Sequence, residues 1–176
     1  MFKKFLSALF FISGIFLISL GFVDLAKRQG IITPEEVIPS PSLATEEPLL
    51  IFLPKVGIKL PIYPTEIKDR KWPTTESGVS YIKDSGRLGV SGNLVMYGHN
   101  WKNLLGSLKN SKVGDTLDIF SNQNKNHSYV IKYVATVDAK DVSILADTSS
   151  ERITLYTCTG LLDSQRFVVV AERIKS

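Results

Sequence analysis

Hydrophobic and polar residues alternate with the two-residue period of β-strands over much of the second half of the chain. The alternation is strongest over Ser128–Val137, where one side carries tyrosine, isoleucine and alanine and the other carries valine, lysine and threonine. Thr116–Phe120 alternates in the same way, and the polar cluster Ser121–Asn126 between the two segments predicts a turn. Leu94–Tyr97 is a continuous apolar run of strand length, which is typical of a buried strand.

Further segments have the length and composition of short strands and are separated by proline, glycine or polar turn residues. These predicted strands are Leu49–Leu53, Lys59–Tyr63, Ile153–Thr157 and Phe167–Ile174. Only Asn103–Lys109 and Asp141–Leu145 suggest a turn of helix. Many short strands with turns predict an all-β barrel or sandwich. Residues 49–176 are numerous enough to enclose one sizeable core.

The N-terminus differs from this pattern because residues 5–23 are apolar and carry no charge. Nineteen residues of helix are about 28 Å long, close to the roughly 30 Å of a bilayer's hydrocarbon core. Lys3 and Lys4 precede the segment, which favours a cytoplasmic location for residues 1–4. We therefore predict a single-pass transmembrane anchor at residues 5–23, with the rest of the chain outside the cell membrane.

A cleaved signal peptide is the alternative interpretation of the same segment. The apolar part of a signal peptide is usually shorter, about 7–15 residues, and it ends in a small-x-small cleavage site. Cleavage after Ala26 would place Asp24 where a small residue is required, so we favour a retained anchor. The chain is exported in either case.

Residues 24–48 are rich in proline, serine, threonine and glutamate, a composition that predicts an extended stalk between the anchor and the β domain. The net charge is +4, and the basic residues are dispersed in runs of at most two. Basic residues without interleaved aromatic residues give no support to nucleic-acid binding, and they fit a solvated surface with a membrane-proximal bias.

The chain has one cysteine, Cys158, so an exported form cannot make an internal disulfide. Such a residue is either a reactive thiol or a buried structural side chain. Residues 153–174 read as a hairpin in which Cys158 ends one strand and Arg166 opens the next. Antiparallel pairing would place the two close together, and a nearby cation favours the thiolate form. Arg166 stays protonated, so it can bind substrate or an oxyanion but cannot act as a base.

A cysteine nucleophile also needs a group that carries protons, and histidine titrates near neutrality. The chain has two histidines. His99 follows the apolar run in Gly98-His99-Asn100, where a loop can present it to a site. His127 lies in the polar sequence Asn-Lys-Asn-His-Ser, which predicts a solvated surface role.

These residues together resemble the sortase family of membrane-anchored transpeptidases. The resemblance covers nearly all of residues 50–174 and rests most strongly on the cysteine segment Thr154–Cys158 and the strand that Arg166 opens. Further similar segments are Gly98-His99, Val56–Ile58, Leu60–Tyr63, Gly78–Ile82 and Gly114-Asp115. The loop between Cys158 and Arg166 is short, Asn100 replaces a common arginine, and the stalk shows no long lid. The compact form therefore resembles class D and class E sortases more than pilin-polymerising ones.

The resemblance implies a closed eight-stranded β-barrel with short helical connections as the catalytic domain, residues 49–176. It implies Cys158 as the nucleophile, His99 as the general acid and base, and Arg166 as the clamp on the oxyanion or substrate. The implied reaction cleaves a Leu-Pro-x-Thr-Gly-like signal on exported proteins through a thioacyl-enzyme. The acyl group then passes to an amine on the cell envelope or on a protein subunit, and no cofactor or metal is expected.

Two alternatives to this function follow from the same residues. Water could resolve the thioester, which would make the protein a cysteine peptidase. The barrel could also be an inactive envelope-binding module in which Cys158 is merely buried.

Overall fold

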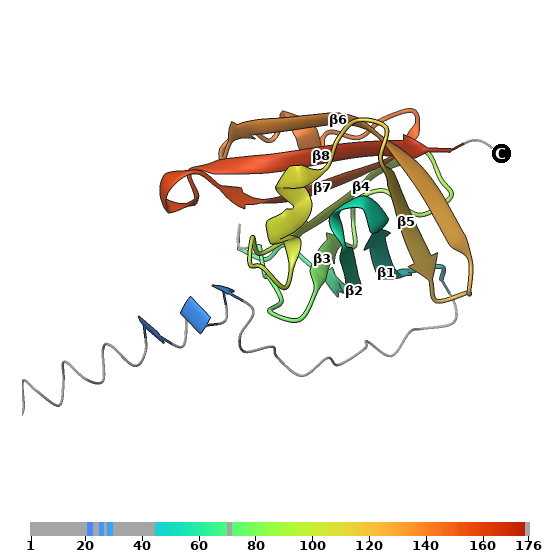
Figure 1. The fold of residues 1–176 in the computed structure, drawn as a ribbon. Coiled ribbons are helices and arrows are strands. Elements are labelled where there is room, and N and C mark those ends of the chain that lie inside the picture. Colours follow the sequence, from blue (N-terminus) through green and yellow to red (C-terminus); the bar gives the residue numbers. More distant parts are fainter. Residues whose placement is uncertain (1–20, 23–24, 27, 30–44, 70–71, 175–176) are drawn as a thin grey trace, which may run out of the picture.

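The computed structural model describes residues 21–22, 25–26, 28–29, 45–69 and 72–174. Its main body is a closed β-barrel with the strand order β1-β2-β3-β4-β7-β8-β6-β5 (Figure 1). The strands are β1 (Pro48–Leu53), β2 (Ile58–Thr65), β3 (Val79–Ile82), β4 (Gly92–Gly98), β5 (Thr116–Ser121), β6 (Asn126–Asp138), β7 (Glu151–Thr159) and β8 (Gln165–Arg173). Short 3₁₀ helices connect them: η1 (Pro54–Val56), η2 (Leu105–Asn110), η3 (Ser143–Leu145) and η4 (Leu161–Asp163). The prediction of an all-β, eight-stranded closed barrel is confirmed.

Each strand predicted from the alternating pattern is present, and the two predicted helical turns appear as η2 and η3. The pattern missed β3, which is only four residues long and almost completely buried. A strand with both faces covered shows no alternation, so its period cannot be read from the sequence. β3 pairs with β2 in parallel and with β4 in antiparallel orientation, and it thereby closes one side of the barrel.

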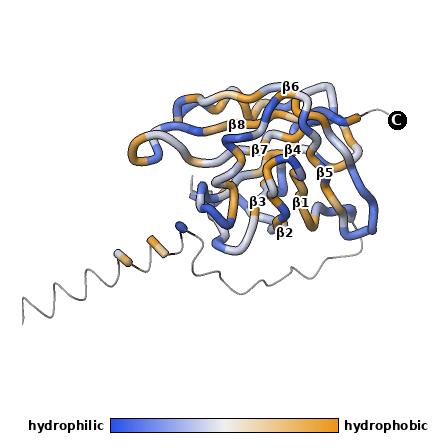
Figure 2. The backbone as a smooth tube through the Cα atoms, in the orientation of Figure 1, coloured by the Kyte–Doolittle hydropathy of each residue, from blue (hydrophilic) through white to orange (hydrophobic). Residues whose placement is uncertain are grey.

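The two-residue period separates a core face from an outer face in the strands that carry the chemistry. Leu94 and Met96 of β4, Leu155 of β7 and Val169 of β8 point into the hydrophobic core. Figure 2 shows the resulting interleaving of hydrophobic and hydrophilic stretches along the strands. The residues between these core positions face outward, which matters for the site described below.

β4 is buried along its whole length, including the residues on its outer face. Two segments cover that face. On one side lies the segment with Pro73, whose carbonyl accepts a hydrogen bond from the Tyr97 hydroxyl at an O···O distance of 2.6 Å. On the other side the Asn93 amide donates to the carbonyls of Ile144 and Ala146, each at 3.1 Å. The outer face of β4 is therefore the floor of a groove between these segments.

The start of β1 is tied to the turn between β5 and β6. The Glu47 backbone N–H donates to Asn122 Oδ1 at 2.9 Å, and Asn122 Nδ2 donates to the Thr45 carbonyl at 2.8 Å. Glu46 Oε1 lies 2.7 Å from His127 Nε2. Partial burial alone raises the pKa of Glu46, but hydrogen bonds from His127, Lys125 and Ser121 outweigh it and lower the pKa to about 2.

The prediction that His127 is a solvated surface residue is wrong, because its side chain is buried with 6% exposed. The polar turn ends one residue earlier than the composition suggested, and β6 begins at Asn126. His127 then shares the inward phase of the alternation with Tyr129 and Ile131, which are also buried.

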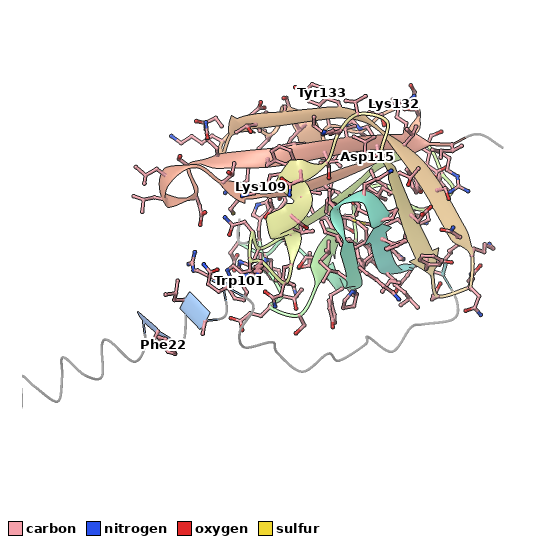
Figure 3. All side chains as sticks on the ribbon, in the orientation of Figure 1. Phe22, Trp101, Lys109, Asp115, Lys132 and Tyr133 are labelled. Atoms are coloured by element: carbon pink, nitrogen blue, oxygen red, sulfur yellow. The ribbon has the colours of Figure 1, made fainter. Side chains whose placement is uncertain are left out.

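The predicted anchor, residues 5–23, and the predicted stalk, residues 24–48, lie mostly outside the described residues. Within the part of the chain that the structure describes, no helix is both long and apolar enough to span a bilayer. The short described pieces before residue 45 include exposed Phe22 (Figure 3) and also buried Ala26. The Lys102 N–H of the barrel donates a hydrogen bond to the Arg28 carbonyl at 3.0 Å.

Candidate active site

The candidate site lies on the outer face of β4, β7 and β8, where the strand period gathers the chemically active residues. Tyr156 and Cys158 alternate with core-facing Leu155 and Thr157 on β7. β4 and β7 run parallel in a register that pairs Tyr97 with Tyr156. The Thr157 hydroxyl fixes the ends of both strands by donating to the Gly98 carbonyl at 2.8 Å. This arrangement sets the end of β7, with Cys158, beside the loop that begins at His99.

Cys158 and Arg166 are directly opposed in the antiparallel β7–β8 pair, as the hairpin interpretation predicts. The thiol is half-buried, and its burial raises the pKa of Cys158. The positive charge of Arg166 lowers that pKa in part, whereas the negative charge of Asp163 raises it further. The resting side chain at neutral pH is therefore the neutral thiol.

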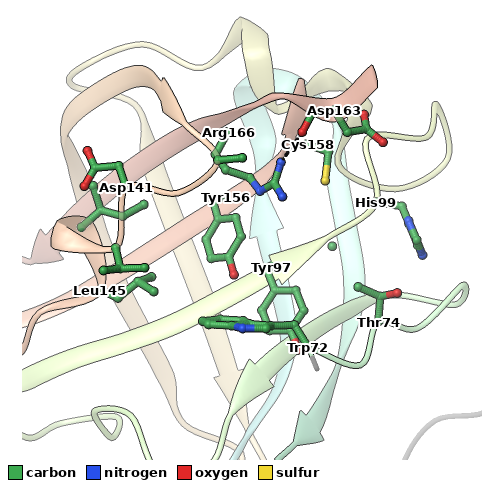
Figure 4. Close-up of a pocket in the computed structure, with 14 residues that line it drawn as sticks. Trp72, Thr74, Tyr97, His99, Asp141, Leu145, Tyr156, Cys158, Asp163 and Arg166 are labelled. Atoms are coloured by element: carbon green, nitrogen blue, oxygen red, sulfur yellow. Dashed lines mark hydrogen bonds between the residues drawn. The ribbon is translucent and has the colours of Figure 1, made fainter. Parts of the chain in front are cut away.

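The short connection between the two strands holds the Arg166 guanidinium. Its Nη1 donates to the carbonyl of Asp163 at 2.8 Å (Figure 4) and to the carbonyl of Gln165 at 2.9 Å. Leu162 and Asp163 of this connection have positive φ angles of 51° and 58°. This left-handed turn directs the Asp163 carbonyl toward the guanidinium, so the backbone positions the charge next to the thiol.

His99 leaves the end of β4 and stacks on Trp101, with ring centroids 4.5 Å apart and an interplanar angle of 12°. Its carbonyl accepts a hydrogen bond from the Leu105 N–H at 3.0 Å, which anchors the loop to η2. Burial lowers the pKa of His99, and Glu76 raises it in part. The imidazole is therefore neutral at neutral pH and able to accept a proton.

A cavity of about 460 Å³ brings the three predicted site residues together. Cys158, His99 and Arg166 all line it. The same cavity is lined by Leu145 and Val142 from the segment between β6 and β7. Cys158 lines this cavity and is only half-buried, so a peptide in the cavity can reach the sulfur.

Three aromatic residues form one wall of this cavity, and sequence reasoning missed them. The rings of Tyr97 and Tyr156 stack at 5.5 Å, and Trp72 packs edge-on against Tyr97, also at 5.5 Å. Tyr97 and Tyr156 each precede a predicted site residue by two positions, so the strand period alone would have placed them on the same face. Trp72 had no such signal, because it lies in the irregular segment between β2 and β3.

The pKa directions predict how the thiol reacts. Because Cys158 is the only cysteine, alkylation by iodoacetamide reports on it alone. The alkylation rate follows the thiolate fraction, so we expect an apparent pKa above the ordinary value of 9.0. Asp163→Asn should lower this pKa and speed alkylation at pH 8, whereas Arg166→Ala should raise it and slow alkylation. A midpoint below 9, or shifts of the opposite sign, would contradict this account of the site.

Comparison with known proteins agrees with the fold. A family model described as the sortase domain matches residues 51–174. Sortase A of Bacillus anthracis is 27% identical over 128 residues, which are 70% of this chain and 58% of that protein. The chain thus spans less than two thirds of that relative's length.

Solved structures show the same fold. Sortase A from Corynebacterium diphtheriae superposes with a TM-score of 0.64 at 27% identity, covering 76% of this chain and 64% of that one. A Clostridium perfringens sortase D5 transpeptidase superposes with a TM-score of 0.62 at 22% identity, covering 73% and 79%. The closed β-barrel is the fold that this chain shares with these sortase structures. The chain belongs to the sortase family.

Proposed function

We propose that this protein is a cysteine transpeptidase that cleaves a sorting signal of the Leu-Pro-x-Thr-Gly type and transfers the acyl part to an amine. The observation that carries the proposal is the direct pairing of Cys158 with Arg166 in a cavity that His99 also lines. Family membership supports the same reaction. The substrates are exported proteins with such a signal, and the acceptor is an amine of the cell envelope or of a protein subunit.

The reaction begins with a neutral thiol and a neutral imidazole. Cys158 attacks the scissile carbonyl, and its proton passes to His99. The negative charge on the carbonyl oxygen is stabilised by Arg166, which the loop carbonyls already hold in place. His99 then gives the proton to the leaving amine nitrogen, and the C–N bond breaks to leave a thioester on Cys158.

The second half of the reaction reverses these roles. The acceptor amine attacks the thioester carbonyl while His99 removes its proton. The C–S bond breaks, the sulfur takes the proton back, and a new amide bond forms.

We also propose that residues 5–23 anchor the protein in the cell membrane and that the barrel lies outside it. The charge-free segment and the two lysines before it support this topology. The short connection between Cys158 and Arg166 supports a position near the class D and class E sortases.

The proposed function is tested with the full-length chain in detergent and a library of Leu-Pro-Xaa-Thr-Gly peptides. We expect mass spectrometry to detect an acyl adduct on Cys158 and, with added triglycine, a ligated product. Release of the free acid alone, in the presence of triglycine, would establish a peptidase. Absence of both adduct and product would favour a binding module.

Arg166 allows charge and geometry to be separated, because arginine offers a rigid fork of donors and lysine a mobile point charge. If Arg166 clamps the oxyanion, Arg166→Lys should lose about 2.7–4 kcal/mol of transition-state stabilisation, the scale of one oxyanion donor. Arg166→Ala should be at least as slow. The measurement compares kcat/KM for transfer with the rate of thiol alkylation. Transfer close to wild type in the lysine variant would leave Arg166 a purely electrostatic role.

A further inference from the structure

A second cavity adjoins the candidate active site and has no part in the reaction described above. Its volume is about 650 Å³, and it lies over the N-terminal half of β4, between the β3–β4 connection and the segment before β7. Trp72 and Leu145 line both cavities, so the two cavities adjoin at these side chains, and together they are called the groove.

The direction of a bound peptide in this groove follows from the proposed chemistry. His99 must protonate the leaving nitrogen, so the leaving half of the substrate lies on the His99 side of Cys158. The acyl half must then extend the other way, along Tyr156 and Tyr97. Figure 4 shows His99 at one end of the pocket and Leu145 at the other, with the aromatic wall between them. The second cavity therefore continues from the acyl end.

The length of β4 shows how much peptide each part of the groove accepts. The register places Gly98 opposite Thr157, so the level of Cys158 corresponds to the residue after Gly98. Four acyl residues in extended form span about 13 Å, which reaches the level of Val95. The second cavity continues to Gly92, about 10 Å further at the same rise per residue. This distance leaves room for two to three more residues.

The lining of the second cavity combines charged residues, Asp84, Arg87 and Asp147, with exposed apolar side chains. Val90 is 55% exposed, and Ile67 is 41% exposed. Trp72 separates the two cavities and is itself partly open to solvent. These side chains fit an apolar peptide segment that lies in extended form along the groove.

We propose that this second cavity binds the two to three residues that precede the sorting motif, and that it favours apolar residues there. The proposal rests on the proposed transpeptidase function, because that function sets the direction of the peptide. The protein would then recognise a substrate segment longer than the five residues of the sorting motif.

The test measures binding to full-length Cys158→Ala protein in detergent by calorimetry, so it does not depend on turnover. The probes are acetyl-Leu-Pro-Ala-Thr-Gly-amide and the same peptide extended at its N-terminus by Ser-Val-Val or by Ser-Ser-Ser. Partial burial of two valine side chains should lower the Kd of the Ser-Val-Val peptide about fivefold to tenfold. The Ser-Ser-Ser peptide should resemble the short one.

Surface variants then locate the effect. Val90→Glu and Ile67→Glu should remove the advantage of the Ser-Val-Val peptide and leave the Kd of the short peptide unchanged. Val113→Glu is the matched control, because Val113 is 61% exposed and does not line the groove. The proposal is overturned if the short and the Ser-Val-Val peptides bind with equal affinity or if neither peptide binds. It is also overturned if the Val90→Glu substitution weakens the binding of both peptides equally.

This outcome is separable from that of the proposed function. Preferential binding of the Ser-Val-Val peptide without any acyl adduct on wild-type Cys158 would refute the transpeptidase and leave the extended groove in place. An acyl adduct on wild-type Cys158, together with equal affinities for the short and the Ser-Val-Val peptides, would support the transpeptidase and refute the extended groove.

Discussion

Replacing Cys158 with alanine abolishes thioacyl formation and amine transfer and leaves the barrel folded. The chain has no second thiol that could take over the attack. Cys158 lies on the outer face of β7 and is only half-buried, so the loss of its sulfur does not open a cavity in the hydrophobic core. The effect is therefore expected on chemistry and not on stability.

The measurement combines mass spectrometry of the acyl adduct with chromatography of the triglycine product. Cys158→Ser is the matched control, because the hydroxyl keeps the shape of the side chain but ionises far less readily than a thiol. Both variants should retain the wild-type unfolding midpoint and the affinity for the short peptide. Retained transfer in the alanine variant would show that the attacking group lies elsewhere.

The parts of the fold that sequence could predict are those with a clear two-residue period. β5 and β6 each have one buried and one exposed face over the paired region, so their alternation was visible. β3 has no exposed face, and the alternation rule fails for such a strand. The pairing order, including the parallel β4–β7 pair, depends on contacts between distant segments and came only from the structure.

The candidate site was predictable where the chain places two groups on one hairpin. Cys158 and Arg166 oppose each other as the sequence suggested. The neighbouring aromatic wall was not predicted, because it is assembled from β4, β7 and the irregular segment around Trp72. His127 was misplaced because a polar composition was taken as a turn, although the residue continues the inward phase of β6. At the end of a strand, the position of a residue in the alternating pattern therefore predicts its burial better than the polarity of its neighbours does.

The second large effect is expected when His99 is replaced. Because His127 is buried and not a surface residue, it provides a control for that experiment. We expect His99→Ala to lower kcat for transfer by the 10²–10⁴-fold typical of general acid–base catalysis. His127 is buried, is hydrogen-bonded to Glu46 and does not line the cavity that contains Cys158, so its substitution is expected to act on folding. His127→Gln, which keeps a hydrogen-bonding side chain, should lower the unfolding midpoint and leave kcat almost unchanged.

The role of His99 in proton transfer can be separated from a merely structural role by changing the leaving group. A peptide p-nitrophenyl ester expels an anion that needs no proton. At a pH above the pKa of Cys158 the thiol also needs no base, so acylation by the ester should then depend much less on His99 than acylation by the amide substrate does. The His99→Ala variant should therefore recover a burst of nitrophenolate with the ester and remain slow with the amide. If the burst is lost to the same degree as amide cleavage, His99 acts by holding the loop and Trp101 in place. If His127→Gln lowers kcat as much as His99→Ala does, the assignment of the proton carrier to His99 is wrong.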